Sequence, residues 1–303
     1  MGEKMTIYYP LYYKDFRCIA ERCRHSCCVG WEIGVDGETV ARYKELAEGE
    51  RDEILSHLDD GGNMILCDGE RCPFLLDDGL CRLISDYGDE YTSRICREHP
   101  RFYHRVWERV ECGIGASCEE ACRIILSSDN YGEFYTAEHN SEIADETDLD
   151  TLSHREYIYS VLANKSISYR TKLAEIKERY SLSDSLFECE HWNNTFYELE
   201  YLDEAHRELI SVGKECGTEE LYPYFERFFA YLVFRHMSVA ESYEGLRARL
   251  GFCLLLLSVI ENATSLGDST FEGICEAARI ISEEIEYSED NTDDLIFEFE
   301  CLI

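Results

Sequence analysis

The sequence has few basic residues for its length. Its 303 residues include 29 Lys and Arg against 63 Asp and Glu, which leaves a formal net charge of −34. Residues 1–128 hold 16 basic and 25 acidic residues, so most of the excess acid follows them. A field of this sign repels phosphates and anionic lipid and attracts cations. We therefore expect no nucleic acid and no membrane among its partners. A protein with exposed lysines fits better, with simple solubility as the alternative reason for the charge.

Targeting segments and long apolar runs are also missing. The start, MGEKMTIYYP, lacks the basic stretch followed by an apolar run that marks a signal peptide. The longest apolar run, LGFCLLLLSVI at residues 250–260, is shorter than the roughly 20 residues of a membrane-spanning helix, and a buried core helix explains it better. We expect a cytoplasmic protein, in which clustered cysteines bind metal or carry chemistry more often than they form disulfides.

The common catalytic motifs do not occur. There is no P-loop, HExxH or GxSxG, and GIGAS at residues 113–117 lacks the third glycine and the βαβ context of a dinucleotide loop. There is no C-x2-C pair either. The chain therefore lacks both the paired cysteines of the usual zinc knuckle and the redox-active C-x2-C motif. The known sequence motifs therefore assign no catalytic residue in this chain.

The distribution of cysteine divides the chain. Eleven of its 16 cysteines lie between Cys18 and Cys122. This region has one predicted amphipathic helix, about Gly37 to Leu58, and several turn-forming Gly-Gly and Asp-Gly pairs. A loop-rich segment of this kind usually needs cross-links or metal. After residue 150, apolar residues recur three and four apart. We predict a mainly α protein: a cysteine-rich, metal-binding module at 1–128, a linker at 129–150, and an acidic all-α bundle at 151–303.

The spacing of the early cysteines favours a metal site. Cys18-x4-Cys23-x3-Cys27-Cys28 puts several thiols within reach of one centre, Cys72 and Cys81 flank the turn CPFLLDDGLC, and Cys96 opens CREHPR. Cys118 lies at the start of a helix predicted for SCEEACRIIL, with Ser117 as its cap. Because adjacent residues point in different directions, Cys27 and Cys28 can serve different centres, and eight cysteines can form two four-thiolate sites.

The residues around these cysteines favour iron–sulfur over zinc. Four arginines can offset the charge of a thiolate-ligated cluster: Arg94, Arg97, Arg101 and Arg105. Zinc, and thiols that bind nothing, remain the alternatives. We expect the histidines of this region (His25, His99 and His104) to be surface or packing residues rather than ligands.

Four motifs carry a resemblance to a known family. YYKDFRCIAERCRHSCCVGWEIGVD, CPFLLDDGLCRLI, ICREHPRF and ECGIGASCEEACRIIL, in this order, resemble the flagellin lysine-N-methylase family. The cysteine frame is also similar to that of zinc- or iron-chelating domain proteins, and ERFFAYLVFRHM resembles a helix of the clostridial-type methylases. The resemblance implies a bacterial enzyme that transfers methyl groups from S-adenosylmethionine to lysines of flagellin or a similar protein. It also implies an iron–sulfur cluster, of 4Fe–4S type, with these candidate ligands: Cys18, Cys23, Cys27, Cys28, Cys72, Cys81, Cys96 and Cys118.

The donor site is harder to place from the sequence. No methyltransferase loop of the Rossmann type occurs. One hypothesis is that Arg97 and Arg101 hold an anionic group, either the donor carboxylate or the cluster; the alternative is ordinary ion pairs with nearby acids. A different class of function is a non-enzymatic module, in which iron–sulfur or zinc stabilises a protein-interaction or electron-transfer domain.

Overall fold

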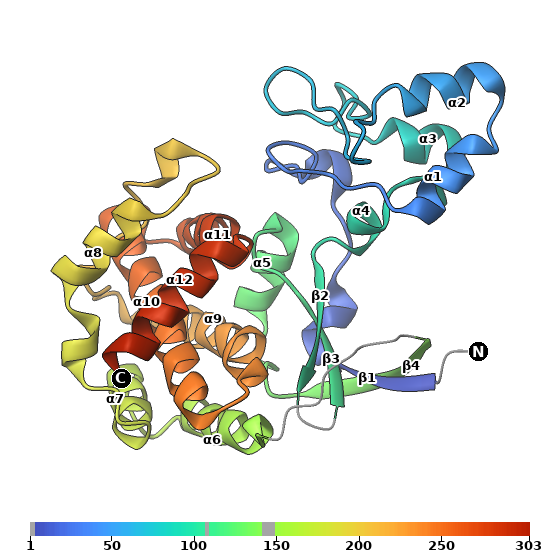
Figure 1. The fold of residues 1–303 in the computed structure, drawn as a ribbon. Helices are drawn as coiled ribbons and strands as arrows, with labels where there is room; N and C mark the ends of the chain where they lie inside the picture. Colours follow the sequence, from blue (N-terminus) through green and yellow to red (C-terminus); the bar gives the residue numbers. More distant parts are fainter. Residues whose placement is uncertain (1–3, 107–108, 141–148) are drawn as a thin grey trace. The chain divides into compact units, whose positions relative to one another are not determined.

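The computed structural model describes residues 4–106, 109–140 and 149–303, and the chain forms two compact units (Figure 1). The cysteine-rich unit comprises Arg17–Phe102 and Cys118–Glu120. The helical unit comprises Met1–Phe16, Tyr103–Ser117 and Ala121–Ile303. This division differs from the predicted modules, because the segments on either side of the cysteine-rich unit pack with the helices.

A four-stranded sheet belongs mainly to the helical unit, and the sequence did not predict it. Its strand order is β2-β3-β1-β4. The strands are β1 (Lys4–Pro10), β2 (Arg101–Val106), β3 (Arg109–Ile114) and β4 (Phe134–Asn140). Ile7 of β1 pairs with Val110 of the parallel β3 and with Ala137 of the antiparallel β4. The predicted fold class lacked this sheet, and β4 lies within the segment 129–150 that was predicted as a linker. The described residues 149–303 contain helices and no strand, as predicted for the all-α domain. Residues 141–148 of the linker fall outside the described residues.

The cysteine-rich unit has short helices and a small core. Its α-helices are α1 (Gly37–Lys44), α2 (Glu48–Leu55), α3 (Arg82–Tyr87) and α4 (Arg94–Glu98), with 3-10 turns at Ala20–Arg22 and Asp89–Tyr91. The single helix predicted over 37–58 is broken, because Ala47, at the N-cap position of α2, has a non-helical backbone (ψ 148°). The buried core consists of six residues: Ile33, Tyr43, Ile54, Met64, Phe74 and Leu83.

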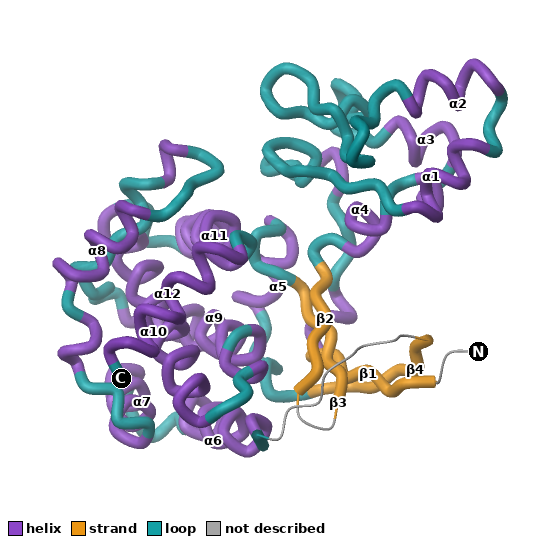
Figure 2. The backbone as a smooth tube through the Cα atoms, viewed as in Figure 1, coloured by secondary structure: helices purple, strands orange, loops and turns teal. Residues whose placement is uncertain are grey.

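The helical unit follows the predicted periodicity. Its helices are α5 (Glu119–Ser127, which begins in the cysteine-rich unit), α6 (Thr151–Ala163), α7 (Tyr169–Arg179), α8 (Cys189–Glu198), α9 (Tyr222–Arg235), α10 (Tyr243–Leu266), α11 (Phe271–Ile281), a π-helix (Ser282–Glu286) and α12 (Glu289–Leu302). Short 3-10 turns lie at Leu11–Asp15, Asp184–Phe187, Glu204–His206, Glu219–Leu221 and Met237–Val239. Figure 2 shows this succession of helices and the connecting loops.

Helix α10 is the central helix of that unit. It packs against α9, α11 and α12. Among the described residues it is the one helix long and apolar enough to cross a membrane, but 78% of that window is buried within the protein. This burial agrees with the core helix predicted for residues 250–260.

Candidate metal centre

All eight predicted cysteine ligands lie in the cysteine-rich unit. Every cysteine of the chain is a free thiol. Cys67 is the ninth cysteine of this unit and was not predicted as a ligand; it is exposed and pairs through its backbone with Arg71. The backbone and the electrostatics divide the eight predicted ligands into two sets of four.

The first thiol set is Cys28, Cys72, Cys81 and Cys96. The Cys72 N–H donates to the Cys28 carbonyl at 2.8 Å, and Leu75 pairs with Cys81 across the turn between Cys72 and Cys81. Cys72 and Cys81 both pack against the six-residue core. Burial raises the pKa of the Cys72 thiol to about 12, and negative charge on the other three members raises it as well. The four thiols are therefore close enough to influence each other's ionisation.

Cys96 is held in this set by helix α4. The helix begins after Ser93, whose hydroxyl accepts the Cys96 N–H at 3.4 Å and donates to the Cys96 sulfur at 3.1 Å. Burial raises the pKa of Cys96, and charges on Cys28 and Cys81 add to this effect.

The second thiol set is Cys18, Cys23, Cys27 and Cys118. The 3-10 turn between the first two closes with the Cys23 N–H donating to the Ala20 carbonyl at 2.9 Å. Hydrogen bonding to Cys28 and burial raise the pKa of Cys27, and negative charges on Cys18 and Cys118 contribute further.

The Glu119 carboxylate joins the two segments that supply this second set. It accepts the Arg24 backbone N–H at 2.9 Å and the Arg24 Nε at 3.0 Å, while the Cys23 thiol points to it at 3.7 Å. Cys118 is the neighbour of Glu119 at the start of α5. Ser117, however, does not cap this helix as predicted. Helix α5 begins at Glu119, and the buried Ser117 hydroxyl has no hydrogen-bond partner among the residues that the structure describes.

The adjacent residues Cys27 and Cys28 belong to different thiol sets. Hydrogen bonding from Cys27 lowers the pKa of Cys28 to about 6, and the Arg71 guanidinium acts in the same direction. Sequence reasoning missed Arg71, although its position directly before Cys72 was an available signal. The opposite side-chain directions of neighbouring residues explain why one pair can contribute to two sets.

The thiol spacing bears on which metal these donors could hold. Across the described ranges, no three of these sulfur atoms all lie within 4.8 Å of one another. A single zinc ion, with Zn–S bonds of about 2.3 Å, gathers its four sulfurs within roughly 4 Å of each other. A four-iron cluster binds each thiolate at a different iron atom, so its ligands lie farther apart. Each thiol set has the donor chemistry for either metal, because iron–sulfur clusters and zinc can both be held by four thiolates.

The predicted anion-binding arginines make backbone contacts in the same unit. Arg97 donates to the carbonyls of Glu90 and Thr92, and Arg101 donates to the Arg97 carbonyl at 3.2 Å. These bonds brace the connection between α3 and α4. Burial, together with the Arg101 charge, lowers the pKa of His99 to about 4, and its ring contacts Trp31. His99 is thus a packed, neutral side chain near pH 7.

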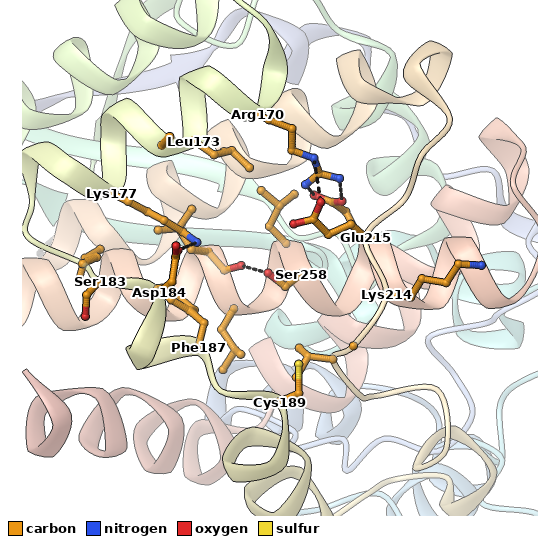
Figure 3. Close-up of a pocket in the computed structure, with 18 residues that line it drawn as sticks. Arg170, Leu173, Lys177, Ser183, Asp184, Phe187, Cys189, Lys214, Glu215 and Ser258 are labelled. Carbon is orange, nitrogen blue, oxygen red and sulfur yellow. Dashed lines mark hydrogen bonds and ion pairs between the residues drawn. The ribbon is translucent and has the colours of Figure 1, made fainter.

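A cavity in the helical unit is a second feature of interest. It has a volume of about 610 Å³ and is lined by α7, α10 and two loops (Figure 3). Its charged side chains mostly pair with one another: Lys177 with Asp184 at 3.1 Å, and Arg170 with Glu261 at 2.5 Å. The size suits a small molecule, but the paired charges leave few polar groups to recognise one.

A histidine–carboxylate cluster also lies in the helical unit. The ligand atoms of His206, Glu283 and Glu284 all lie within 4.8 Å of one another. Glu284 already accepts from His206 at 2.6 Å and from the Leu202 N–H at 2.7 Å, and Glu283 pairs with Arg279 at 2.7 Å. These bonds join the loop after α8 to the π-helix, so the cluster has a structural explanation without a metal.

Fold and site together define a mainly helical protein with a thiol-rich unit. No family model matches the chain, and no solved structure does. Among curated proteins it is similar to the lysine-N-methylases of Salmonella choleraesuis and Salmonella typhimurium, each 27% identical over 134 residues, which is 41% of this chain. It is also similar to the flagellar biosynthetic protein FliU of Salmonella muenchen, 26% identical over 134 residues and 79% of that protein.

The match spans about a third of the length of the two lysine-N-methylases, 33% in each case. The resemblance to lysine-N-methylases predicted from the motifs is confirmed over the matched segment.

Proposed function

We propose that this protein is an S-adenosylmethionine-dependent protein lysine N-methyltransferase that acts on flagellin or a similar lysine-bearing protein. In this proposal the cysteine-rich unit holds an iron–sulfur cluster. One observation carries it: the eight cysteines of the methylase-like frame lie in a single compact unit as two sets of four, in a chain similar to named lysine-N-methylases. The FliU relative, named for flagellar biosynthesis, supports a flagellar substrate.

Each thiol set offers four sulfur ligands. A thiolate-ligated cluster supplies an electron-rich centre whose potential depends on burial and on hydrogen bonds to its sulfurs. The chain prepares Cys28 for this role, because Cys27 and Arg71 lower its pKa to about 6 and so favour the thiolate near pH 7. The Ser93 hydroxyl, which donates to the Cys96 sulfur, supports a thiolate there in the same way.

The transfer itself is a polar displacement with no net oxidation. The lone pair of a neutral lysine amine attacks the methyl carbon of the sulfonium donor. The carbon–sulfur bond then breaks with its electrons on sulfur, and S-adenosylhomocysteine leaves. The new ammonium can release its proton to water. A negative field attracts the lysine but also stabilises its charged form, so the site must lower the pKa of the lysine or accept its proton.

The test begins with anaerobically purified, full-length protein. Iron, zinc and acid-labile sulfide are counted on one sample, and transfer of a labelled methyl group to purified flagellin is measured on the same sample. We expect matched iron and sulfide and label on flagellin lysines. Cys96→Ser should lose iron, whereas Cys67→Ser, in the same unit but outside both thiol sets, should retain it. Iron-loaded protein that neither binds the donor nor labels lysine would overturn the enzyme assignment.

The alternative is a non-enzymatic interaction or electron-transfer module stabilised by iron–sulfur or zinc. It is favoured by the short match, which covers 33% of the methylases. Donor binding by calorimetry separates the two functions, because a module of this kind has no need to bind S-adenosylmethionine. Colourless protein with stoichiometric zinc would favour the zinc-stabilised form of this alternative.

A further inference from the structure

Tyr43 has a buried hydroxyl with no hydrogen-bond partner. The residue lies on α1 and is 0% exposed, and its Oη contacts no donor or acceptor in the described part of the chain. A buried hydroxyl that loses water without gaining a partner is unfavourable, and such groups usually have an explanation. The partner that this hydroxyl needs is an acceptor.

Tyr43 shares its surroundings with the first thiol set. It belongs to the six-residue core against which Cys72 and Cys81 pack. Burial raises the pKa of Tyr43 well above its usual range, and the next causes are negative charges on Cys96, Cys81 and Cys72. The charged groups that act most strongly on this phenol are therefore three of the four thiols in the set.

One carboxylate fixes the helix of Tyr43 to the helix of Cys96. Asp36 accepts the Thr39 N–H at 3.0 Å at the start of α1 and the Arg94 N–H at 2.8 Å at the start of α4. Arg42, next to Tyr43, donates to the Glu90 carbonyl at 3.0 Å. These bonds hold the phenol and the thiol in a defined relation before any metal binds.

We propose that the Tyr43 hydroxyl donates a hydrogen bond to a sulfur atom of the iron–sulfur centre held by Cys28, Cys72, Cys81 and Cys96, and that it raises the reduction potential of that centre. The inference rests on the metal-binding part of the proposed function. Thiolate and sulfide sulfur atoms supply the missing acceptor, and a hydrogen bond to them stabilises the reduced, more negative cluster.

The first test compares Tyr43→Phe with Tyr87→Phe in the full-length chain loaded anaerobically with iron and sulfide. Tyr87 packs against the same core, but Glu50 and Asp86, rather than cysteines, raise its pKa after burial. We expect Tyr43→Phe to keep its iron and sulfide and to show a more negative midpoint potential, and Tyr87→Phe to match the unmodified protein. An unchanged potential in Tyr43→Phe would overturn the proposal.

Thermal stability gives a second, independent test. Without metal, Tyr43→Phe removes an unpaired hydroxyl, so its Tm should stay the same or rise. In the loaded protein it removes a hydrogen bond, so its Tm should fall. Equal losses of Tm in both states would count against the proposal.

A third variant covers the case in which Tyr43→Phe does not take up iron. Tyr43→3-fluorotyrosine keeps the hydroxyl and makes it a stronger donor, so the potential should rise; no change would refute the hydrogen bond. None of these measurements uses the methyl donor or a lysine substrate. Loss of the enzyme assignment therefore leaves the inference standing, whereas protein that takes up only zinc would overturn the inference itself.

Discussion

Replacing Glu111 with glutamine should destabilise the helical unit by several kcal/mol. Glu111 lies on β3 with its carboxylate fully buried. Its two oxygens accept from Arg155 at 2.6 and 2.7 Å, and Oε1 also accepts from Arg109 Nε at 2.7 Å. Arg155, on α6, is itself 2% exposed. This ion pair therefore joins the sheet to the first helix of the bundle inside the core.

The size of the loss follows from what the substitution leaves behind. Glutamine keeps the shape of the side chain but leaves the Arg155 guanidinium buried without its countercharge. Removing one partner of a buried pair costs about 3–5 kcal/mol. That is a large part of the 5–15 kcal/mol by which domains are usually stable. For a unit of this size it corresponds to a fall in Tm on the order of 10 °C.

Urea denaturation followed by far-UV circular dichroism measures the loss. The matched control is Glu204→Gln, which removes the exposed partner of Arg207 and should leave the midpoint unchanged. A loss of under about 1 kcal/mol for Glu111→Gln, the size typical of surface pairs, would refute the reasoning.

The same pair predicts a pH dependence. Burial alone would raise the pKa of Glu111, but Arg155 holds it below the usual 4.5. The ionised carboxylate therefore contributes stability above about pH 4.5, and this contribution is lost as the pH falls towards the folded-state pKa. Glu111→Gln should accordingly lose less stability than the unmodified protein on acidification. Parallel acid curves for the two proteins would contradict this.

Three further predictions concern other parts of the molecule. Gly115→Ala would place a Cβ against Tyr287 Oη and 2.7 Å from Arg235 Nη1. We expect the free energy of unfolding in urea to fall by about 1–3 kcal/mol. An unchanged free energy of unfolding would mean that both side chains move aside. Removing metal from the loaded protein should expose residues 17–102 to proteolysis while the helical unit stays intact. The reason is that the core of the cysteine-rich unit is small. An unchanged cleavage map would argue against a metal-dependent fold. Association with a lysine-rich protein substrate should slow as salt rises, because the chain carries a net charge of −34; a salt-independent rate would exclude electrostatic docking.

The helices were predictable because their signal is local. Each helix after residue 150 repeats apolar residues over several turns, and a window of that length contains the whole pattern. The sheet left no such signal. Ile7 finds its partner at Val110, and the strands are six or seven residues long, so the pairing that defines them lies outside any local window. For this reason β4 lies in a segment whose sequence predicted only a linker.

The candidate site was predictable in composition but not in arrangement. Clustering and irregular spacing marked the eight cysteines, and the adjacent Cys27 and Cys28 raised the idea of two centres. Their division depends on contacts between distant segments, such as the Cys72 N–H on the Cys28 carbonyl and Arg24 on Glu119. Tyr43 had no sequence signal at all, since its orphaned hydroxyl exists only after the core has formed.

The pKa values of the thiols determine how metal binding to them would depend on pH. In the metal-free chain, charges on neighbouring thiols help to raise the pKa of Cys72, Cys81 and Cys96. The fold thus places together thiols that would repel one another if ionised, and their raised pKa values keep these three protonated near neutral pH. A bound cation or iron cluster would replace the repulsion between thiolates by attraction to the metal, because it stabilises every thiolate at once and releases their protons. We therefore expect metal binding to these thiols to strengthen as the pH rises.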